Sequence, residues 1–289
     1  MPPENPYLAY VESFKEIFER GESLPLGKIP KPPPVELEQN APLAILFSPH
    51  PDDECIIGGL PLRLMRESGI RILNVAVTLG SNHERRYPRL NELQQACDWL
   101  GFELMEAKRG GLDNITLQRR REDRSGWEEV VNTIAGIISS ENPDYLFLPH
   151  DKDWNGTHLG VHYLTMDALQ LQSKEFETNI LETEFWGQMQ SPNLMIESST
   201  TDLADILAAL SYHVGEVQRN PYHLRLPAWM QDNVRVGAEL VGGQGEIAPD
   251  FNFATLYRSS VWQNRQMNIA WNTGRQLSKE QDPHELFEK

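Results

Sequence analysis

Short apolar runs alternate with amphipathic stretches from residue 43 to about residue 171. Leu43 to Phe47 is an apolar run bounded by prolines, which is typical of a central strand covered on both faces. Further strands are predicted at 70–78, 102–106 and 144–148. The spacing between these runs leaves room for a helix after each strand, as in parallel sheets with right-handed crossovers.

The predicted helices carry recognisable end signals. They span 57–67, 89–100, 125–140 and 158–171. Gly69 and Gly101 end the first two, and Ser125 with Glu128 forms a capping box at the start of the third. The sequence therefore predicts an α/β fold with a mostly parallel sheet and helices on both faces.

The two ends of the chain have less regular patterns. Residues 7–20 form an amphipathic helix, and residues 22–42 contain six prolines and no periodicity, which predicts an extended strap. Beyond residue 180, strands are expected at 181–188 and 193–198 and a helix at 201–218, with no clean period from 219 on. We expect an N-terminal helix and strap (1–42) and a single domain (43–289), whose irregular C-terminal part, about 180–289, supplies substrate-side elements.

Composition narrows the function classes. The 289 residues are 39% hydrophobic and 24% charged, a globular balance, and carry a formal net charge of −16. This charge repels phosphate backbones, so a nucleic-acid partner is not expected, and no apolar run is long enough for a transmembrane segment. The first ten residues lack the pattern of a signal peptide, and two cysteines, Cys55 and Cys97, cannot form a disulfide framework. We therefore expect a cytoplasmic location.

The densest chemical signal is Ser48-Pro49-His50-Pro51-Asp52-Asp53-Glu54, directly after the first strand. Sites in open α/β sheets form at the carboxyl ends of strands. Adjacent carboxylates repel one another, and a bound cation removes that repulsion. His50 and Asp53 could share a divalent metal such as zinc, although Fe, Co or Mn is also compatible with N and O ligands. Capping of the next helix by the acids is the alternative reading.

A second polar loop follows the fourth strand. It contains His150, His158 and His162 within 13 residues. His158 starts the predicted helix and is the preferred third ligand, while His162 is expected to pack on a helix face and His150 fits either role.

The His-Pro-Asp-Asp-Glu string with a distal His158 resembles the PIG-L/LmbE family of zinc-dependent N-deacetylases, as does Arg89-x-x-Glu92 after the second strand. The resemblance implies a Rossmann-like fold and hydrolysis of N-acetyl groups, typically from N-acetylglucosamine units. It also implies that His50, Asp53 and His158 bind Zn²⁺ and that Asp52 is the general base.

One position departs from the family pattern. Many members carry His-Pro-Asp-His where this chain has Asn155-Gly156-Thr157-His158. Asn155 can donate a hydrogen bond to the oxyanion but cannot carry a proton, so His213 and His150 are further candidates for the second catalytic residue.

Substrate contacts are predicted from three further features. Arg89 is the preferred member of an arginine group with Arg85 and Arg86, which could hold a phosphate or carboxylate on the substrate or simply form a solvated helix start. Asp113 could bind sugar hydroxyls or belong to a turn. Residues 220–230 contain aromatic side chains that suit sugar rings but are more often part of a core.

The sequence thus predicts a metal-dependent hydrolase that removes an N-acyl group from an amino sugar or glycoconjugate. Two alternatives stay open: an amidase of a thiol-sugar conjugate, and a sugar-binding member of the fold without turnover. The oligomeric state is not predicted.

Overall fold

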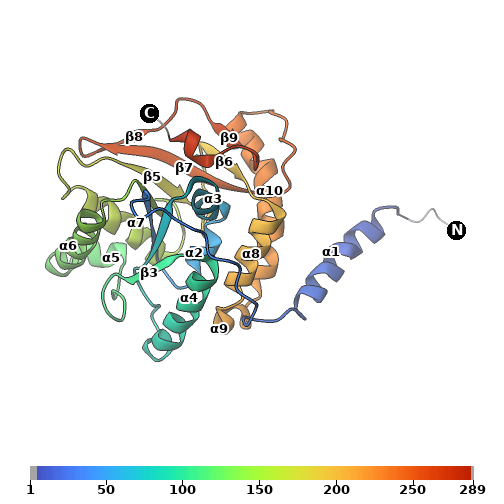
Figure 1. Ribbon diagram of the computed structural model, residues 1–289, viewed down its shortest axis with the longest axis horizontal. Helices are drawn as coiled ribbons and strands as arrows, with labels where there is room; N and C mark the ends of the chain where they lie inside the picture. Colours follow the sequence, from blue (N-terminus) through green and yellow to red (C-terminus); the bar gives the residue numbers. More distant parts are fainter. Residues whose placement is uncertain (1–4, 288–289) are drawn as a thin grey trace.

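The computed structural model describes residues 5–287 and has a single central sheet (Figure 1). Residues 1–4 of the predicted N-terminal segment and 288–289 of the predicted domain lie outside this range. Within it the sheet has nine strands in the order β3-β2-β1-β4-β5-β7-β6-β9, with β8 paired to β7. Strands β1 to β5 are parallel to one another, whereas β7 runs antiparallel to both β5 and β6. The predicted α/β class with a mostly parallel sheet is confirmed.

The strands lie close to the predicted apolar runs. Their bounds are Leu43–Ser48 (β1), Arg71–Ala76 (β2), Glu103–Glu106 (β3), Tyr145–Pro149 (β4), Thr178–Thr183 (β5), Leu194–Glu197 (β6), Ala254–Gln263 (β7), Gln266–Ile269 (β8) and Arg275–Leu277 (β9).

The helices occupy the segments between these strands. The α-helices are Leu8–Gly21 (α1), Asp53–Ile56 (α2), Gly59–Ser68 (α3), Arg86–Leu100 (α4), Leu117–Glu122 (α5), Arg124–Glu141 (α6), Gly156–Leu169 (α7), Thr200–Leu210 (α8), Val214–Val217 (α9) and Leu226–Gly237 (α10). Shorter helical turns are His83–Arg85 (η1), Tyr222–Arg225 (η2), Ala238–Gly242 (η3) and Pro283–Leu286 (η4).

Strand β1 lies at the centre of two hydrophobic cores. Ala44 and Leu46 pack with the layer that contains α2, α3, α4 and α8, whereas Ile45 and Phe47 pack with the layer of α6 and α7. Successive side chains of a strand point to opposite faces, so a strand covered on both faces needs an uninterrupted apolar run. This explains why every residue of β1 is buried.

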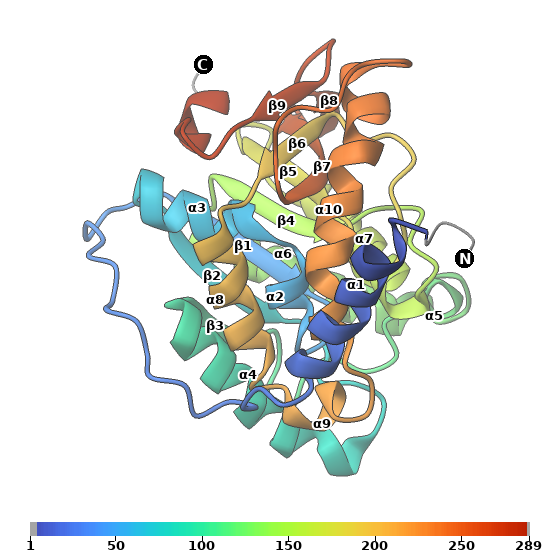
Figure 2. The same ribbon diagram turned by 90° about the vertical axis from the view of Figure 1, so that its right-hand side faces the viewer.

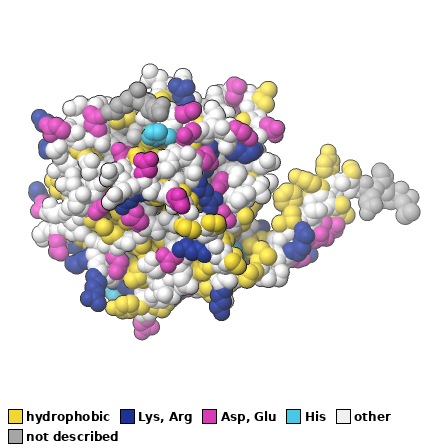
Figure 3. Space-filling model, in the orientation of Figure 1, with side chains coloured by type: hydrophobic (Ala, Val, Ile, Leu, Met, Phe, Trp, Pro, Cys, Tyr) yellow, Lys and Arg dark blue, Asp and Glu magenta, His cyan; other side chains and the backbone are white. Residues whose placement is uncertain are grey.

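Helix α1 projects from the body of the molecule (Figure 1) and buries none of its residues. Its apolar side chains Val11, Phe14 and Ile17 are exposed. Figure 3 shows hydrophobic side chains gathered on the surface of this projecting helix. The attachment is at its end, where the Arg225 guanidinium lies 3.7 Å from the centroid of the Phe18 ring.

The strap at 22–42 contains no helix or strand and crosses the outside of the layer that contains α8 and α4 (Figure 2). Gly27 N donates to Ser211 Oγ (3.1 Å), and Tyr212 Oη donates to the Ile29 carbonyl (3.0 Å). The strap therefore packs on its own chain, and it leads into the amino end of β1.

Three local predictions were wrong. Asp123, and not Ser125, is the N-cap of α6, because its carboxylate accepts from Gly126 N. The predicted helix 201–218 breaks into α8 and α9, since Ser211 donates to the Ala208 carbonyl and the chain turns to bury His213. Residues 184–188, expected in a strand, follow the end of β5 as loop.

The region from 219 on contains regular elements that the sequence did not reveal, chiefly α10 and β7. Among residues 5–287, no helix combines the length and apolar character that crossing a bilayer requires.

Candidate active site

The candidate site lies at the carboxyl ends of β1 and β4, where the strand order of the sheet reverses. Strands β2 and β3 lie on one side of β1, and β4 lies on the other, so the loops after β1 and β4 diverge at the point where ligands bind in open α/β sheets. The pairing of Ala44 with Tyr145 aligns these two strands. Their carboxyl ends bring together two loops separated by about one hundred residues of sequence.

Three donor atoms from the two loops form a nearly equilateral triangle. His50 Nδ1 lies 3.2 Å from His158 Nε2, and each of these nitrogens lies 3.3 Å from Asp53 Oδ2. Metal–ligand bonds of about 2.0–2.1 Å in a tetrahedral zinc site separate neighbouring ligand atoms by about 3.3–3.4 Å. The other oxygen, Asp53 Oδ1, is buried without a hydrogen-bond partner. The three residues predicted as ligands therefore lie in an arrangement that fits one divalent ion.

The third imidazole is held from behind by a carboxylate. His158 Nδ1 donates to Asp153 Oδ2 (3.0 Å), and Asp153 also accepts from the backbone nitrogens of Asn155 and Gly187. Such a carboxylate–histidine pair fixes the ring orientation and makes the free nitrogen more basic. Burial disfavours charge on this ring, but Asp53 and Asp153 outweigh it and raise the pKa of His158 to about 10. A cation at this position would be favoured by the same carboxylates.

The carboxyl of Asp53 has the opposite electrostatic balance. Burial disfavours its ionisation, but the imidazoles of His158 and His50 outweigh burial and hold the pKa of Asp53 well below its ordinary value. Asp53 is therefore an anion in the folded protein, as a metal-binding carboxylate must be.

Asp52 differs from Asp53 in environment and backbone. Its backbone has φ of 114°, in the region that disfavours a side chain, which costs about 1–3 kcal/mol. Burial, with the adjacent charge of Asp53, raises the pKa of Asp52 to about 6. Tyr222 Oη donates to Asp52 Oδ2 (2.6 Å), and Arg89 Nη2 lies 3.8 Å from Oδ1. A carboxyl with a near-neutral pKa, exposed to a cavity beside the three donors, is suited to exchange protons.

The strained backbone of Asp52 is supported by a buried ion pair. Glu54 Oε2 accepts from Asp52 N (2.9 Å), and Glu54 Oε1 lies 2.6 Å from His213 Nε2. Both side chains of this pair are fully buried. His213, a candidate for the second catalytic residue, therefore contacts Glu54, which in turn accepts from Asp52 N.

The other histidines of the second loop contact backbone groups. His150 Nε2 donates to the Gly187 carbonyl (2.8 Å), and His162 Nδ1 donates to the Pro149 carbonyl (2.9 Å). Both rings are buried, and these bonds fix the course of the loop around His158.

Asn155 is the N-cap of α7. Its Oδ1 accepts from Thr157 N (2.9 Å) and His158 N (3.4 Å), so its amide nitrogen remains to donate elsewhere. Asn155 lines the same cavity as His50 and Asp52. It thus combines a structural role with a position from which it can reach a substrate.

Two cavities meet at His50. The larger, of about 560 Å³, is lined by polar groups and a few apolar ones: His50, Thr78, Gly80, Ser81, His83, Arg86, Leu112, Asp113, Asn114, Ile115, Thr116 and Thr157. The smaller, of about 350 Å³, is lined by aromatic and charged side chains: His50, Asp52, Arg89, Trp154, Asn155, Trp186, Glu216, Arg219, Asn220 and Tyr222. A substrate bound at the donor triangle can extend into both.

The predicted substrate residues divide between the two cavities. Asp113 lies at the larger one and is paired with Arg86, while Arg89 lies at the smaller one and donates to the Pro51 carbonyl (2.8 Å). The structure therefore separates Arg86 from Arg89, although they are one helical turn apart.

Sequence reasoning identified only part of the wall of the smaller cavity: it predicted His50, Asp52, Arg89 and Asn155 as site residues, but it did not single out Trp186, Glu216 or Arg219. Trp186 and Tyr222 stack edge to face (ring centroids 5.1 Å apart). Tyr222 belongs to the aromatic segment 220–230, which was the only signal for it, and Glu216 and Arg219 gave none.

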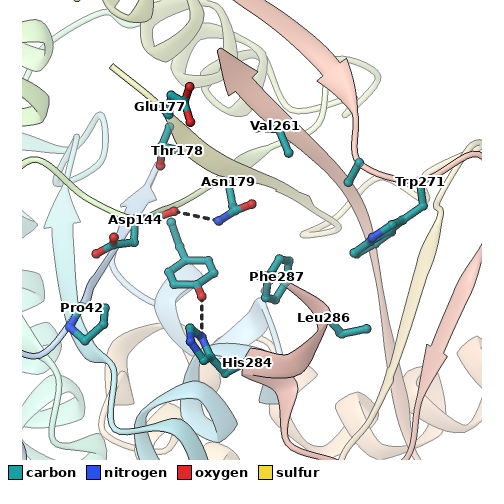
Figure 4. Close-up of a pocket in the computed structure, with 12 residues that line it drawn as sticks. Pro42, Asp144, Glu177, Thr178, Asn179, Val261, Trp271, His284, Leu286 and Phe287 are labelled. Atoms are coloured by element: carbon teal, nitrogen blue, oxygen red, sulfur yellow. Dashed lines mark hydrogen bonds between the residues drawn. The ribbon is translucent and has the colours of Figure 1, made fainter. Parts of the chain in front are cut away.

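A third cavity, of about 360 Å³, lies at the opposite end of the parallel strands from the candidate site (Figure 4). It borders the amino ends of β1, β4 and β5, where the Tyr145 hydroxyl lies 2.9 Å from His284 Nδ1 and Asn179 donates to the Asp144 carbonyl. It contains none of the predicted site residues.

Comparison with known families places this site in context. Residues 45–169 match the family model described as PIG-L: GlcNAc-PI de-N-acetylase. This segment contains both loops of the donor triangle and confirms the resemblance predicted from the sequence. No curated protein sequence matches the chain.

Several solved structures share the fold. An N,N'-diacetylchitobiose deacetylase from Pyrococcus horikoshii is 16% identical (TM-score 0.54; 89% of this chain and 93% of that one covered). A teicoplanin deacetylase is 15% identical (TM-score 0.54; 76% and 97%), and the 4-carboxy-2-hydroxymuconate hydratase GalB from Pseudomonas putida KT2440 is 16% identical (TM-score 0.56; 75% and 95%). At these identities the likeness establishes the fold, and the chemistry must be argued from the site.

Proposed function

Starting from the PIG-L family, which residues 45–169 match, we propose that this protein is a metal-dependent N-deacetylase that acts on an amino sugar or glycoconjugate. The observation that carries the proposal is the triangle of His50, Asp53 and His158 donor atoms, 3.2–3.3 Å apart, beside the carboxyl of Asp52. The deacetylase names of two structural neighbours support the same reaction class.

We propose that His50, Asp53 and His158 hold Zn²⁺ or a similar divalent transition metal. When bound, the ion supplies Lewis-acid chemistry: it polarises an amide carbonyl and makes hydroxide accessible near neutral pH.

Asp52 is the proposed general base. Its carboxylate accepts a proton from the attacking water as the new C–O bond forms, and it delivers that proton to the amine nitrogen as the C–N bond breaks. Its raised pKa suits both steps, because a group that titrates near pH 6 accepts and releases protons at neutral pH. The Tyr222 hydroxyl orients the carboxylate through its 2.6 Å bond.

The oxyanion that forms from the acetyl carbonyl requires a hydrogen-bond donor. We propose the amide nitrogen of Asn155, which is held at the cavity wall because Oδ1 is fixed by the start of α7. Arg89 and Asp113 are the proposed substrate-binding residues of the smaller and larger cavities. The segment from about residue 180 supplies the substrate-side wall, through Trp186 and Tyr222.

The test begins with elemental analysis of the purified protein, followed by an acetate-release assay with N-acetylglucosamine derivatives. We expect about one equivalent of transition metal and release of acetate with free amine. Asp52→Asn is expected to retain metal and lose turnover, whereas His158→Ala loses metal. His284→Ala, at the opposite end of the parallel strands, is the control for histidine replacement. If the folded protein neither binds added Zn²⁺ nor gains activity from it, the metal-dependent mechanism is wrong.

The same assay separates the alternatives. A thiol-sugar amidase would release an acyl group other than acetate. It would be detected by the release of free amine from N-acylated thiol-sugar conjugates. A sugar-binding protein without turnover would bind these compounds and release no amine. The reason to test this alternative is Asn155, which cannot carry a proton as the histidine of the family pattern can.

A further inference from the structure

The third cavity contains hydrogen-bond acceptors that the described part of the protein leaves unused. Asp144, Thr178 and Asn179 line it from the amino ends of β4 and β5 (Figure 4). Thr178 is 4% exposed, and its Oγ1 is buried without a hydrogen-bond partner. Asn179 uses its amide nitrogen to donate to the Asp144 carbonyl (3.2 Å), so its Oδ1 remains as an acceptor. Because buried polar atoms without a partner are rare in folded proteins, this wall points to a ligand with N–H or O–H donors.

Asp144 adds a charge to this wall. Its Oδ2 accepts from Leu43 N (2.9 Å), a neutral donor. Asp151 and Asp167 each have an arginine partner, whereas Asp144 pairs with no lysine or arginine of residues 5–287. None of these residues that lines the cavity is a lysine or an arginine, and Glu177 is a second carboxylate of the wall. The negative charge of Asp144 therefore favours a cationic ligand.

Aromatic side chains form the other wall of the third cavity. Figure 4 shows Trp271 and Phe287 across from Asp144 and Thr178. The Trp271 and Phe287 ring centroids are 6.1 Å apart, and the Tyr145 ring packs edge to face on Phe287 (5.1 Å). Aromatic rings attract a cation to their faces and also suit an apolar body. A volume of about 360 Å³ is near the lower end for ligand cavities and so suits a small compound.

We propose that the third cavity binds a small primary ammonium compound, with the –NH₃⁺ group at Asp144, Thr178 and Asn179 and the body of the compound against Trp271 and Phe287. A primary ammonium group has three donors and no acceptor, which matches one carboxylate and two neutral oxygens.

This site is separate from the proposed active site. Tyr145, at the third cavity, and Pro149, next to His150, are the two ends of β4. Five strand residues at about 3.3 Å each place the two ends about 15 Å apart. The proposal therefore does not depend on the proposed deacetylase function, and it can be tested by binding alone.

The first experiment compares matched compounds at pH 7. Benzylamine is compared with benzyl alcohol, and glucosamine with glucose, by following the tryptophan indole N–H signals by NMR, with the Trp271 signal assigned from Trp271→Phe. We expect the amine of the preferred pair to shift the Trp271 signal with a Kd about tenfold below that of its neutral partner, the scale of one charge-assisted hydrogen bond. The pair with the larger ratio identifies the body as aromatic or sugar.

Two outcomes would overturn the proposal. One is an equal Kd for the amine and its neutral partner within both pairs. The other is a shift confined to Trp154 and Trp186, which line the smaller cavity at His50, because the amines would then bind at the proposed active site.

A pair of variants tests the carboxylate. Asp144→Asn removes the charge and keeps an acceptor for Leu43 N. Glu239→Gln is the matched control, because the exposed Glu239 also accepts one backbone N–H, that of Gly245 (2.9 Å), and lies outside the cavity. We expect the tenfold advantage of the amine to disappear in Asp144→Asn and to persist in Glu239→Gln. The same advantage in both variants would refute the assignment.

Thr178→Val tests the unpartnered hydroxyl with little change of shape. Removing a buried hydroxyl that has no partner should leave Tm unchanged or raise it. We expect the Kd of the amine to rise about fivefold, the scale of one hydrogen bond. A folded Thr178→Val protein with an unchanged Kd would contradict the proposed position of the ammonium group.

Discussion

The buried pair of Glu54 and His213 gives the sharpest stability prediction. The 2.6 Å contact between Glu54 Oε1 and His213 Nε2 joins two side chains with no solvent exposure, and His213 Nδ1 has no partner. Removing one member of a buried pair leaves the other charge without compensation, which costs about 3–5 kcal/mol. Glu54→Gln keeps the shape of the side chain and one acceptor oxygen. We therefore expect the free energy of unfolding to fall by an amount near the lower end of this range, about 3 kcal/mol at pH 6.

The sign of the pH dependence follows from the histidine. Burial disfavours its charge, but Glu54 and Asp52 outweigh burial and raise the pKa of His213 above its ordinary value of 6.5. A raised histidine pKa contributes stability that is complete below 6.5 and is lost as pH rises through the folded-state value. The difference between wild type and Glu54→Gln is therefore expected to shrink from pH 6 to pH 9.

The assay is urea denaturation of both proteins at the two pH values, with His213→Gln and the double variant completing a cycle. Glu128→Gln, in an exposed i,i+4 pair with Arg124, is the control and is expected to cost less than 0.5 kcal/mol. Because Glu54 also accepts a hydrogen bond from the strained backbone of Asp52, kcat is expected to fall as well. A loss below 1 kcal/mol at pH 6, or one that grows toward pH 9, would refute the reasoning.

Three further predictions concern single positions. Burial raises the pKa of Glu184 to about 7 from an ordinary 4.5. The free energy of unfolding therefore falls by about 3 kcal/mol as the pH rises from 4.5 to 7. Glu184→Gln, which keeps the acceptor for Met189 N, is therefore expected to raise Tm by several degrees at pH 8 and hardly at pH 5. Asn155→Asp keeps the cap of α7 and should retain stability while losing acetate release, whereas Asn155→Ala should also lose about 1 kcal/mol in denaturant titrations. Gly160→Ala places a Cβ 2.1 Å from the Ile115 carbonyl oxygen and should lower Tm markedly, while Gly136→Ala, in open space, should not.

The sequence predicted those parts of the fold that depend on local pattern. The apolar run of β1 is buried on both faces, and Gly101 ends α4 in the left-handed conformation, as expected. Local signals failed where two were in competition: Asp123 and Ser125 are both good caps, and only the course of the chain at the start of α6 decides between them. The cytoplasmic location stays a prediction.

The candidate ligands were accessible to sequence reasoning because their chemistry is concentrated in two short strings at strand ends. The proximity of His50, Asp53 and His158 could be predicted because neighbouring parallel strands have their carboxyl ends on the same side of the sheet. The resemblance to a family then assigned the individual roles, which spacing alone could not do.

The sequence by itself determined the alternation of strands and helices, the two polar loops and the excess of acid. Only the tertiary structure decided which arginines act together: Arg86 pairs with Asp113, while Arg85 and Arg89 join Arg219 from more than one hundred residues away. The physical reason is that hydrophobic periodicity specifies which face of an element is buried. The partner of a charged side chain, by contrast, depends on the path of loops that have no period to read.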